Sequence, residues 1–449
     1  MAVFVFDIII LLLVAYILLD LRGGFLVSLC CRVFLPHTVR LILGGISVSI
    51  LDVLSISLLL SFLIHKDEIE ARMPRPIILF LVIDVVSSFI LVFFSSKYVP
   101  VNEQIYCLLK IKVVGETLLY AIAYYALSEL DIDLITDRLM TVSIVCGIYG
   151  ILGYITRTNP YMSLISMTYL HEDAAALVFM DETRGFLTGR IMGTMDHPLS
   201  WGQYWDVVIP FCILTNKGEN PGKLKAFVII GIINVFLCGS RTALLALVIF
   251  GLFYLKSRGA GQAFKYIALG VILLFTISLV TPSDTKIGKY MKASFLFWNK
   301  DIADNADISG SSMEMRLQQL ALGYDVISNS ILGGYGYHFR AYIQEEGTEI
   351  EGMLGYESVV LSELVERGIM GVAVYFSLFG ILLYSIKSYR ETEGDKIYLA
   401  YGFILCYLSA VVATGIQGVG TFFFMALLFK YISDCERNKP IEPELENAE

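Results

Sequence analysis

Charged residues are scarce in this sequence, and their scarcity excludes a water-soluble protein. Only 17% of the 449 residues are Asp, Glu, Lys or Arg, whereas 56% are apolar. A soluble chain with this balance would expose far more apolar surface than water tolerates, so lipid must surround most of it. The net charge of −9 owes a large share to the acidic tail and to residues 345–351, and nucleic acid is not an expected partner.

Cysteine is absent from the one long polar segment, residues 282–356, although the chain has eight cysteines elsewhere. This absence argues against a disulfide-stapled ectodomain and against a cysteine-bound metal. His171 and His197 lie beside acidic residues without a His-x-x-x-His spacing, so the sequence predicts neither a metal site nor a cofactor. The first apolar run lacks a basic start and a small-residue cleavage site, so we expect it to be retained as a span.

Apolar runs of about 20 residues, the length that crosses a bilayer as a helix, recur along the chain. Twelve such runs begin near residues 2, 39, 77, 104, 139, 198, 224, 240, 263, 357, 397 and 418. The run at 23–36 is too short to cross and contains Arg32, so we expect it to lie at the interface or to re-enter the membrane. The predicted fold class is an all-α polytopic membrane protein with about 12 transmembrane helices.

The basic residues of the short loops predict the orientation, because Lys and Arg favour the cytoplasmic side. Four basic loops fall on one side of the predicted spans, at residues 66–75, 217–225, 256–265 and 387–396. Both termini then share the cytoplasmic side. The predicted organisation is N-terminal transmembrane helices at 1–156, an extracytoplasmic loop at 157–197, central helices at 198–281, a long extracytoplasmic loop at 282–356, C-terminal helices at 357–434 and a cytoplasmic tail at 435–449.

The long loop is where we expect the function to lie, because a loop of this length inside a compact membrane protein is usually functional. Residues 313–328 can form an amphipathic helix. The sequence Gly333-Gly334-Tyr335-Gly336-Tyr337 predicts an irregular turn.

Arginines mark the extracytoplasmic face, where a guanidinium near hydrocarbon costs several kcal/mol unless something pairs with it. The four are Arg184, Arg190, Arg241 and Arg316. Arg241 opens a helix directly after Cys238-Gly239-Ser240, with no acidic residue within a helical turn. A planar guanidinium binds phosphate oxygens bidentately, and a helix N-terminus adds its positive end, so this position predicts an anion site. The alternative is that Arg241 snorkels to lipid headgroups.

The other arginines have structural alternatives of equal weight. Arg190 has three acidic residues nearby, at positions 181, 182 and 196, with which it could pair. Arg316 could bond Glu314 or solvent. If these arginines converge on one cleft, they form an electropositive pocket for a diphosphate headgroup.

Two candidate bases lie at the end of the long loop. Glu357 marks the point where the loop enters the tenth span, and partial burial there favours accepting a proton from a hydroxyl. The alternative is a carboxylate that the helix dipole stabilises. His338 is the second candidate, with a solvated loop histidine as its alternative. Tyr335 and Tyr337 are candidates for stacking on sugar rings, and Arg184 and His197 are further substrate-binding candidates.

Other charged residues lie inside the predicted spans. Glu363 and Arg367 are four residues apart on the tenth span, a spacing that predicts a structural ion pair. Asp84 and Glu116 lie near the predicted midplane, and no motif explains them.

Taken in order, these residues resemble the O-antigen ligase and Wzy-type polysaccharide polymerase superfamily over about residues 185–375. The motifs that carry the resemblance are Arg190-x-x-Gly193 before His197-Pro198, then Ser240-Arg241-Thr242, then Arg316 on a loop helix that leads to Gly333-Gly334-Tyr335-Gly336, then Glu357-Ser358 followed by Gly368-x-x-Gly371. Each motif is short, and their order and placement make the combination specific.

The resemblance implies a metal-independent, inverting, GT-C-like glycosyltransferase of the bacterial inner membrane with an extracytoplasmic active site. Its donor would be an oligosaccharide on undecaprenyl pyrophosphate, its acceptor a growing glycan chain, and a chain-length regulator a further partner beside membrane lipid. The pyrophosphate-binding arginines of the family map onto Arg190, Arg241 and Arg316. The catalytic base would be Glu357 or, as second choice, His338.

Three functions fit this resemblance to different degrees. Ligases of the family have His-Asn where the long loop re-enters the membrane, whereas this chain has Glu357-Ser358, which favours a repeat-unit polymerase. A ligase or single-glycan transferase is the first alternative. A lipid-linked sugar flippase or transporter is the second, but arginines clustered at one surface favour chemistry there over passage through the membrane.

Overall fold

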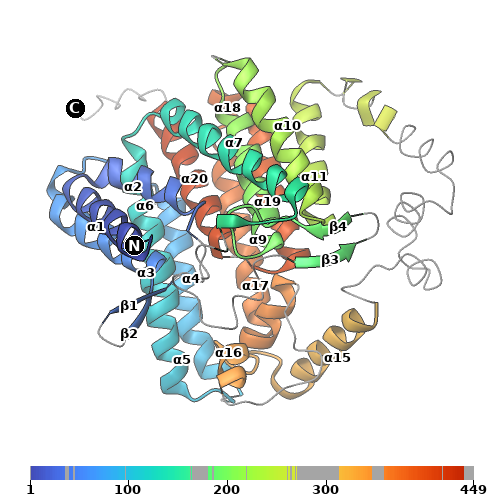
Figure 1. Ribbon diagram of the computed structural model, residues 1–449. Helices are drawn as coiled ribbons and strands as arrows, with labels where there is room; N and C mark the ends of the chain where they lie inside the picture. The colour runs from blue at the N-terminus through green and yellow to red at the C-terminus, as the bar shows by residue number, and fades with distance from the viewer. Residues whose placement is uncertain are drawn as a thin grey trace, which may run out of the picture.

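Helices make up most of the structure, a computed structural model that describes residues 2–35, 40–43, 46–96, 98–161, 163, 180–184, 187–218, 220–259, 261–262, 265–267, 269–270, 313–345, 358–416 and 418–438. The elements, drawn in Figure 1, are α1 (Ala2–Leu19), α2 (Leu21–Cys31), β1 (Arg40–Leu43), β2 (Ile46–Ser49), α3 (Ile50–His65), the 3-10 helix η1 (Lys66–Glu68), α4 (Arg75–Phe94), α5 (Val101–Cys107), the π-helix η2 (Leu108–Leu118), α6 (Leu119–Ser128), α7 (Ile132–Thr156), β3 (Met180–Arg184), β4 (Leu187–Arg190), α9 (Pro198–Thr215), α10 (Pro221–Leu237), α11 (Arg241–Ser257), α15 (Met313–Ser330), α16 (Phe339–Glu345), α17 (Val359–Lys387), α18 (Arg390–Glu393), α19 (Lys396–Thr414) and α20 (Gly418–Arg437).

Five helices in the described ranges are long and apolar enough to cross a membrane, namely α4, α7, α17, α19 and α20. The chain is therefore a multi-pass membrane protein. The helix α2, with 11 residues, is too short to cross, as its sequence predicted. Much of the run predicted to begin near residue 263 lies outside the described residues. Twelve spans were predicted, and five helices of the described ranges qualify as spans. The side of the membrane on which the termini lie stays a prediction.

The predicted start of the second span near residue 39 is wrong, because a β-hairpin precedes the helix. β1 pairs antiparallel with β2, with Arg40 opposite Ser49. Gly44 and Gly45 connect the two strands, and a Gly-Gly pair between short apolar stretches favours a hairpin. Ser49 then caps α3, since its hydroxyl accepts the Leu51 backbone N–H at 3.2 Å, and the helix begins at Ile50.

The centre of the bundle is α9, which is buried along nearly its whole length. It packs against α7, α10, α11, α19 and α20 (Figure 1). Trp201 and Tyr204 stack with ring centroids 5.5 Å apart, and Trp205 meets Trp201 edge-on at the same distance. Gly231 lets α10 approach closely, because a Cβ there would lie 2.7 Å from the Trp205 ring. This aromatic core fixes α9, whose amino end follows directly on the segment that carries Arg190.

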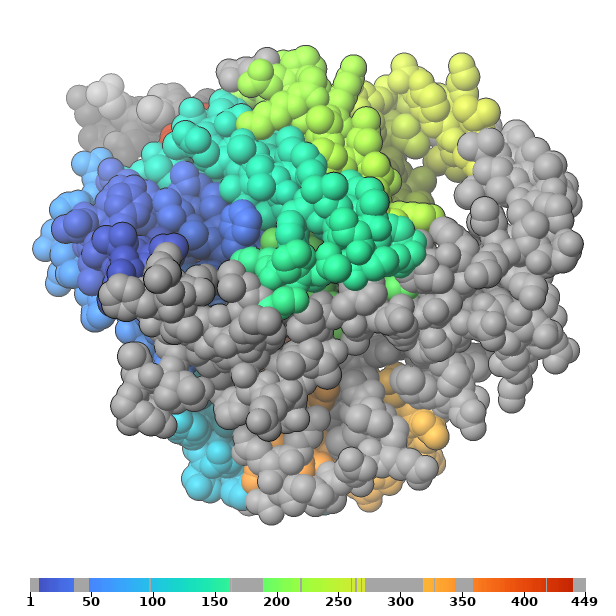
Figure 2. Space-filling view, viewed as in Figure 1, coloured from blue at the N-terminus to red at the C-terminus, as the bar shows by residue number. Residues whose placement is uncertain are grey.

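The outer helices expose large apolar side chains, as a lipid-facing surface requires. Leu11, Ile155 and Ile229 are more than half exposed. In Figure 2 the blue atoms of α1, the teal atoms of α7 and the light-green atoms of α10 form one continuous surface. This surface lies around the core that α9 forms.

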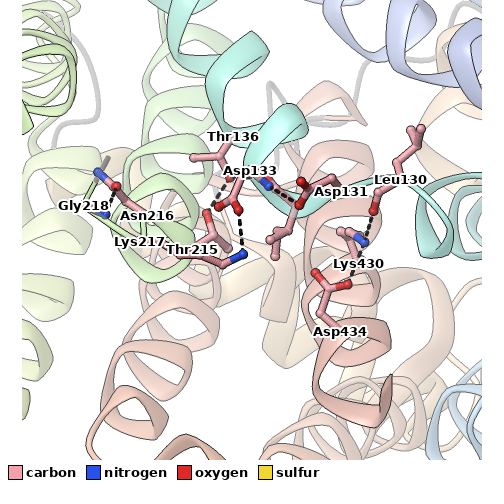
Figure 3. A network of polar contacts seen from close by, with 11 residues as sticks. Leu130, Asp131, Asp133, Thr136, Thr215, Asn216, Lys217, Gly218, Lys430 and Asp434 are labelled. Atoms are coloured by element: carbon pink, nitrogen blue, oxygen red, sulfur yellow. Dashed lines mark hydrogen bonds and ion pairs between the residues drawn. The ribbon is translucent and has the colours of Figure 1, made fainter. Parts of the chain in front are cut away.

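An ion-pair network ties the loops together at one end of the bundle (Figure 3). Lys217 Nζ lies 2.5 Å from Asp133 Oδ2, which joins the α9–α10 loop to α7. Lys430 Nζ lies 2.7 Å from Asp434 Oδ1 and donates to the Leu130 carbonyl at 2.6 Å, which joins α20 to the start of α7. In Figure 1, α18 lies at this end, whereas α15 and α16 lie at the opposite end.

Candidate functional site

The turn between α10 and α11 presents Arg241 at a helix amino end. The Ser240 hydroxyl caps α11 by accepting the Ala243 N–H at 3.3 Å, and Gly239 supplies the positive φ of +66° that the turn needs. α11 begins at Arg241, as the sequence predicted. No hydrogen bond or ion pair joins the half-buried Arg241 side chain to another described residue. The site therefore offers a cation and a positive helix end together.

Arg190 docks onto this same turn. β4 ends at Arg190, and the next residue, Ile191, donates its backbone N–H to the Leu237 carbonyl at 3.2 Å. The Arg190 Nε donates to the Cys238 carbonyl at 2.8 Å, and its side chain is only 2% exposed. A Cβ on Gly239 would lie 3.4 Å from that Nε, so the missing side chain leaves room for the guanidinium. Two of the three predicted pyrophosphate-binding arginines thus meet at one turn.

The segment after Arg190 leads into α9 and encloses a small cavity. His197 caps α9, because its Nδ1 accepts the Leu199 N–H at 3.0 Å. The cavity lies between Arg190, Asn159 and Gly193 and has a volume of about 10 Å³. That volume holds about one water molecule and no sugar ring. His197 therefore has a structural role in starting the helix, and its predicted contact with substrate stays a prediction.

A further buried arginine, Arg32, follows the end of α2, and its surroundings could not be predicted from the sequence. Its side chain is 6% exposed, its Nη2 donates to the Ser55 hydroxyl at 2.8 Å, and its guanidinium lies 4.0 Å from the centre of the Phe422 ring. The neighbouring Val33 carbonyl accepts the Thr194 hydroxyl at 2.6 Å. The end of α2 is thus bonded to the segment that follows Arg190.

The predicted glycine turn is present and lies between two distant parts of the chain. Tyr335 donates its backbone N–H to the Val365 carbonyl at 2.7 Å, on α17. On the other side, Ser96 donates its backbone N–H to the Gly334 carbonyl at 2.9 Å, and Gln104 Oε1 accepts the Tyr337 N–H at 3.0 Å. The turn is therefore bonded both to α17 and to α5 with the stretch that precedes it.

Glycine is required at two positions of this arrangement. Gly334 has φ +66°, and a Cβ there would lie 2.5 Å from the Val365 carbonyl oxygen. Gly368 has φ +67° and ψ −168° and breaks α17 into two helical parts. A Cβ on Gly368 would lie 2.4 Å from the Leu332 backbone, closer than real contacts allow. The kink in α17 opens the space that the turn occupies.

The two tyrosines of the turn are largely covered by protein. The Tyr335 hydroxyl donates to Asp325 Oδ2 at 2.6 Å, its ring lies 4.9 Å from that of Phe339, and the residue is 9% exposed. Burial raises the pKa of Tyr335 and of Tyr337, so both phenols stay protonated at neutral pH. Stacking of these rings on a sugar would need the turn to open.

His338 completes the turn in an unusual conformation. Its φ of +67° lies in the left-handed region, which a residue with a side chain adopts at a cost. Its backbone N–H donates to Glu366 Oε2 at 3.3 Å, and its carbonyl accepts the Tyr342 N–H at 3.0 Å, in the first turn of α16. A candidate base thus sits at a strained and well-bonded position.

Behind the turn, the charged residues of three helices pair with one another. Lys112 Nζ lies 3.0 Å from Asp84 Oδ2 and 2.7 Å from Glu116 Oε2. The predicted pair is confirmed, since Arg367 Nη1 lies 2.9 Å from Glu363 Oε2. Asp84 and Glu116, which no motif explained, are therefore partners of a lysine on η2.

Three predicted site residues are not placed as side chains. Glu357 lies outside the described residues. For Arg184 and Arg316 the structure gives the backbone, in β3 and α15, and not the side chain. Within the described ranges, no group of three or more His, Cys, Asp or Glu side chains could hold a metal ion.

Comparison with known proteins gives a family match for the part of the chain that contains the α10–α11 turn and the glycine turn. No curated protein matches the chain. Residues 226–376 match the family model described as O-antigen ligase. The match ends where the resemblance seen in the sequence ends, but it begins at 226 and not near 185, so Arg190 and His197 lie before it. This membrane protein of polysaccharide biosynthesis therefore contains an O-antigen ligase (Wzy_C) family domain at residues 226–376.

Proposed function

We propose that the protein is a glycosyltransferase that polymerises oligosaccharide repeat units carried on undecaprenyl pyrophosphate. The product would be an O-antigen, capsule or exopolysaccharide chain, made on the extracytoplasmic face. The observation that carries the proposal is the docking of Arg190 onto the turn that begins α11, where its guanidinium bonds the Cys238 carbonyl three residues before Arg241 and the helix amino end. A diphosphate is the ligand that suits such a group of donors.

The proposed reaction is a displacement at the anomeric carbon. An acceptor hydroxyl oxygen attacks that carbon, the bond from the carbon to the pyrophosphate oxygen breaks, and undecaprenyl pyrophosphate leaves with the bonding electron pair. Negative charge grows on the leaving oxygen, and fixed guanidinium groups in a dry cleft stabilise it where it forms. The leaving group then needs no acid, and Arg190, Arg241 and Arg316 supply the positive charge without a metal ion.

The acceptor hydroxyl loses its proton to a base during the attack. Glu357 is the first choice by its predicted place at the start of the tenth span. His338 is the second, and it lies on the glycine turn next to α17. Attack from the face opposite the leaving group inverts the anomeric configuration, so NMR of the linkage made from a donor of defined configuration should show inversion.

Transfer of a finished glycan to a different acceptor is the second candidate function. The description of the matching family as O-antigen ligase favours it. The residues Glu357-Ser358 favour polymerisation, because they replace the His-Asn that the family's ligases carry at this position.

The decisive experiment uses the purified protein in liposomes with a lipid-linked repeat unit. A ladder of chains on a gel supports polymerase, and one product of single transfer to another lipid supports ligase. The matched variants are Arg241→Ala and Arg258→Ala, which remove an arginine from the amino end and from the carboxyl end of the same helix, α11. Loss of product with the first and not the second supports the anion site. Full product from Arg241→Ala would refute it.

A further inference from the structure

Glu366 is a carboxylate that the ion pairs of α17 leave without a contacting cation. Its neighbour Arg367 bonds Glu363, one turn earlier on the same helix. In the described part of the chain, the hydrogen bond that the Glu366 carboxylate makes comes from the His338 backbone N–H, at 3.3 Å. Glu366 lies two residues before the kink at Gly368, so the kink and the carboxylate face the same turn.

Both the backbone and the side chain of Glu366 hold the end of the glycine turn. Its carbonyl accepts the Gly336 N–H at 3.2 Å, while its carboxylate accepts the N–H of His338. The conformation of His338, with φ +67°, is one that histidine adopts only when the surrounding structure holds it. The strained residue His338 is thus hydrogen-bonded to Glu366 through its N–H and to the first turn of α16 through its carbonyl.

We propose that Glu366 is a positioning residue for His338, and that His338 is the base of the transfer reaction. This inference rests on the proposed function. The carboxylate fixes the backbone that carries the imidazole, and its ionised form favours the imidazolium that forms when the hydroxyl proton is taken. The proton moves from the acceptor oxygen to the imidazole, while the pyrophosphate oxygen takes the electron pair of the broken bond.

Other charges act on this pair and must be considered in its titration. Glu363 and Arg367 act on Glu366 from the same helix, and Arg340 acts from α16. Lys112 and Glu116 act on the neighbouring Tyr337 from η2. Since Glu363 and Arg367 carry opposite charges and pair with each other, Glu366 is the carboxylate of α17 that contacts the His338 backbone.

The test compares Glu366→Gln with Glu391→Gln, an exposed carboxylate on α18 at the far end of the bundle. Polymer formation from the lipid-linked repeat unit is measured against pH, together with KM for the donor. For Glu366→Gln we expect kcat to fall about tenfold, with KM for the donor nearly unchanged. We also expect the acid limb of the kcat profile to move down by about half a pH unit, because the imidazole loses a nearby negative charge. A loss of kcat with an unmoved acid limb would show a structural role alone and would overturn the proposal.

A second measurement does not depend on activity. Amide hydrogen exchange of residues 331–345 should rise in Glu366→Ala and stay close to the wild type in Glu391→Gln. Unchanged exchange overturns the positioning role. If the wild type forms product and His338→Asn does as well, this inference fails while the proposed function stands. If the wild type forms neither polymer nor a single-transfer product, the proposed function itself fails.

Discussion

Two regions of the molecule bury cations in opposite ways. Behind the glycine turn, Lys112 and Arg367 each contact carboxylates, and the charges compensate one another within the protein. Near the segment of Arg190, Arg32 contacts a hydroxyl and an aromatic ring, and Arg241 contacts no acidic residue among those described. A buried charge with an internal partner is tolerated in the fold and is costly to leave unpaired, whereas one without a partner needs a counter-charge from outside. The difference separates a structural cluster from the site proposed for an anionic ligand.

The largest effect on stability should come from removing a cation from the ion pairs behind the glycine turn. Lys112→Met leaves Asp84 and Glu116 close together without their cation, so we expect the free energy of unfolding in detergent to fall by about 3–5 kcal/mol. Lys110→Met, two residues earlier and exposed, is the control and should change it little. The triple change of Lys112→Met with Asp84→Asn and Glu116→Gln should recover part of the loss. A single Lys112→Met variant as stable as the wild type would show that the cluster is not structural.

Loss of Arg241, which has no acidic partner among the described residues, should change activity and not stability. Arg241→Ala should lower the rate of transfer about 100- to 1,000-fold, as removal of one fixed donor from a charge-stabilising site does elsewhere. The melting temperature of the protein should be unchanged within experimental error, since no hydrogen bond or ion pair of the side chain with a described residue is lost. Gel analysis of the product and a thermal unfolding curve on one preparation measure both. A large drop in melting temperature would place Arg241 with the structural cations.

The glycine kink should show an intermediate effect. Gly368→Ala puts a Cβ within 2.4 Å of the Leu332 backbone at a residue of positive φ, so we expect a loss of about 1–3 kcal/mol and of most of the activity. Gly380→Ala on the same helix is the matched control, because no atom lies within 4 Å of its Cβ and alanine favours the helix by about 1 kcal/mol. Equal stability of the two variants would contradict the role of the kink.

The smallest effect should come from the exposed ion pair between Lys217 and Asp133 in Figure 3. Lys217 is 56% exposed at its side chain, and its bond to Asp133 is open to solvent. Lys217→Ala should therefore cost less than about 1 kcal/mol, and the cost should shrink further in high salt. Thermal unfolding at low and high salt measures it. A cost as large as that of Lys112→Met would mean that burial does not distinguish the two kinds of pair.

Local sequence signals were enough to predict several features of the site. The helix that begins at Arg241, the four-residue spacing of Glu363 and Arg367 and the glycine turn all follow from residues near one another in the chain. The contacts that assemble them do not. Arg190 meets the Cys238 carbonyl 48 residues away, and His338 meets Glu366 28 residues away, so only the packing of helices brings them together. Asp84 was unexplained for the same reason, because its lysine lies on η2 and not on α4. Glu116, in contrast, lies four residues from Lys112 on the same helix, so this spacing is a local signal in the sequence that was missed.

The predicted spans show a further limit of sequence patterns. An apolar run fits a buried strand as well as a helix, and residues 40–43 pair with 46–49 as two strands where a span was expected. The length of the apolar run also does not predict the kink in α17, because the kink depends on the close approach of Gly368 to the Leu332 backbone. Such departures arise where tertiary contacts override local preference.

The glycine turn has a consequence for how the protein is made. Tyr337 bonds Gln104, a residue 233 positions earlier, while Tyr335 bonds Val365, which is synthesised later. The turn can therefore reach its final geometry only after the ribosome has passed α17 and that helix has met α4 in the membrane. A nascent chain that stops before α17 should have a complete α10–α11 turn while the glycine turn still lacks its bonds to Val365, so the glycine turn is completed late in biogenesis.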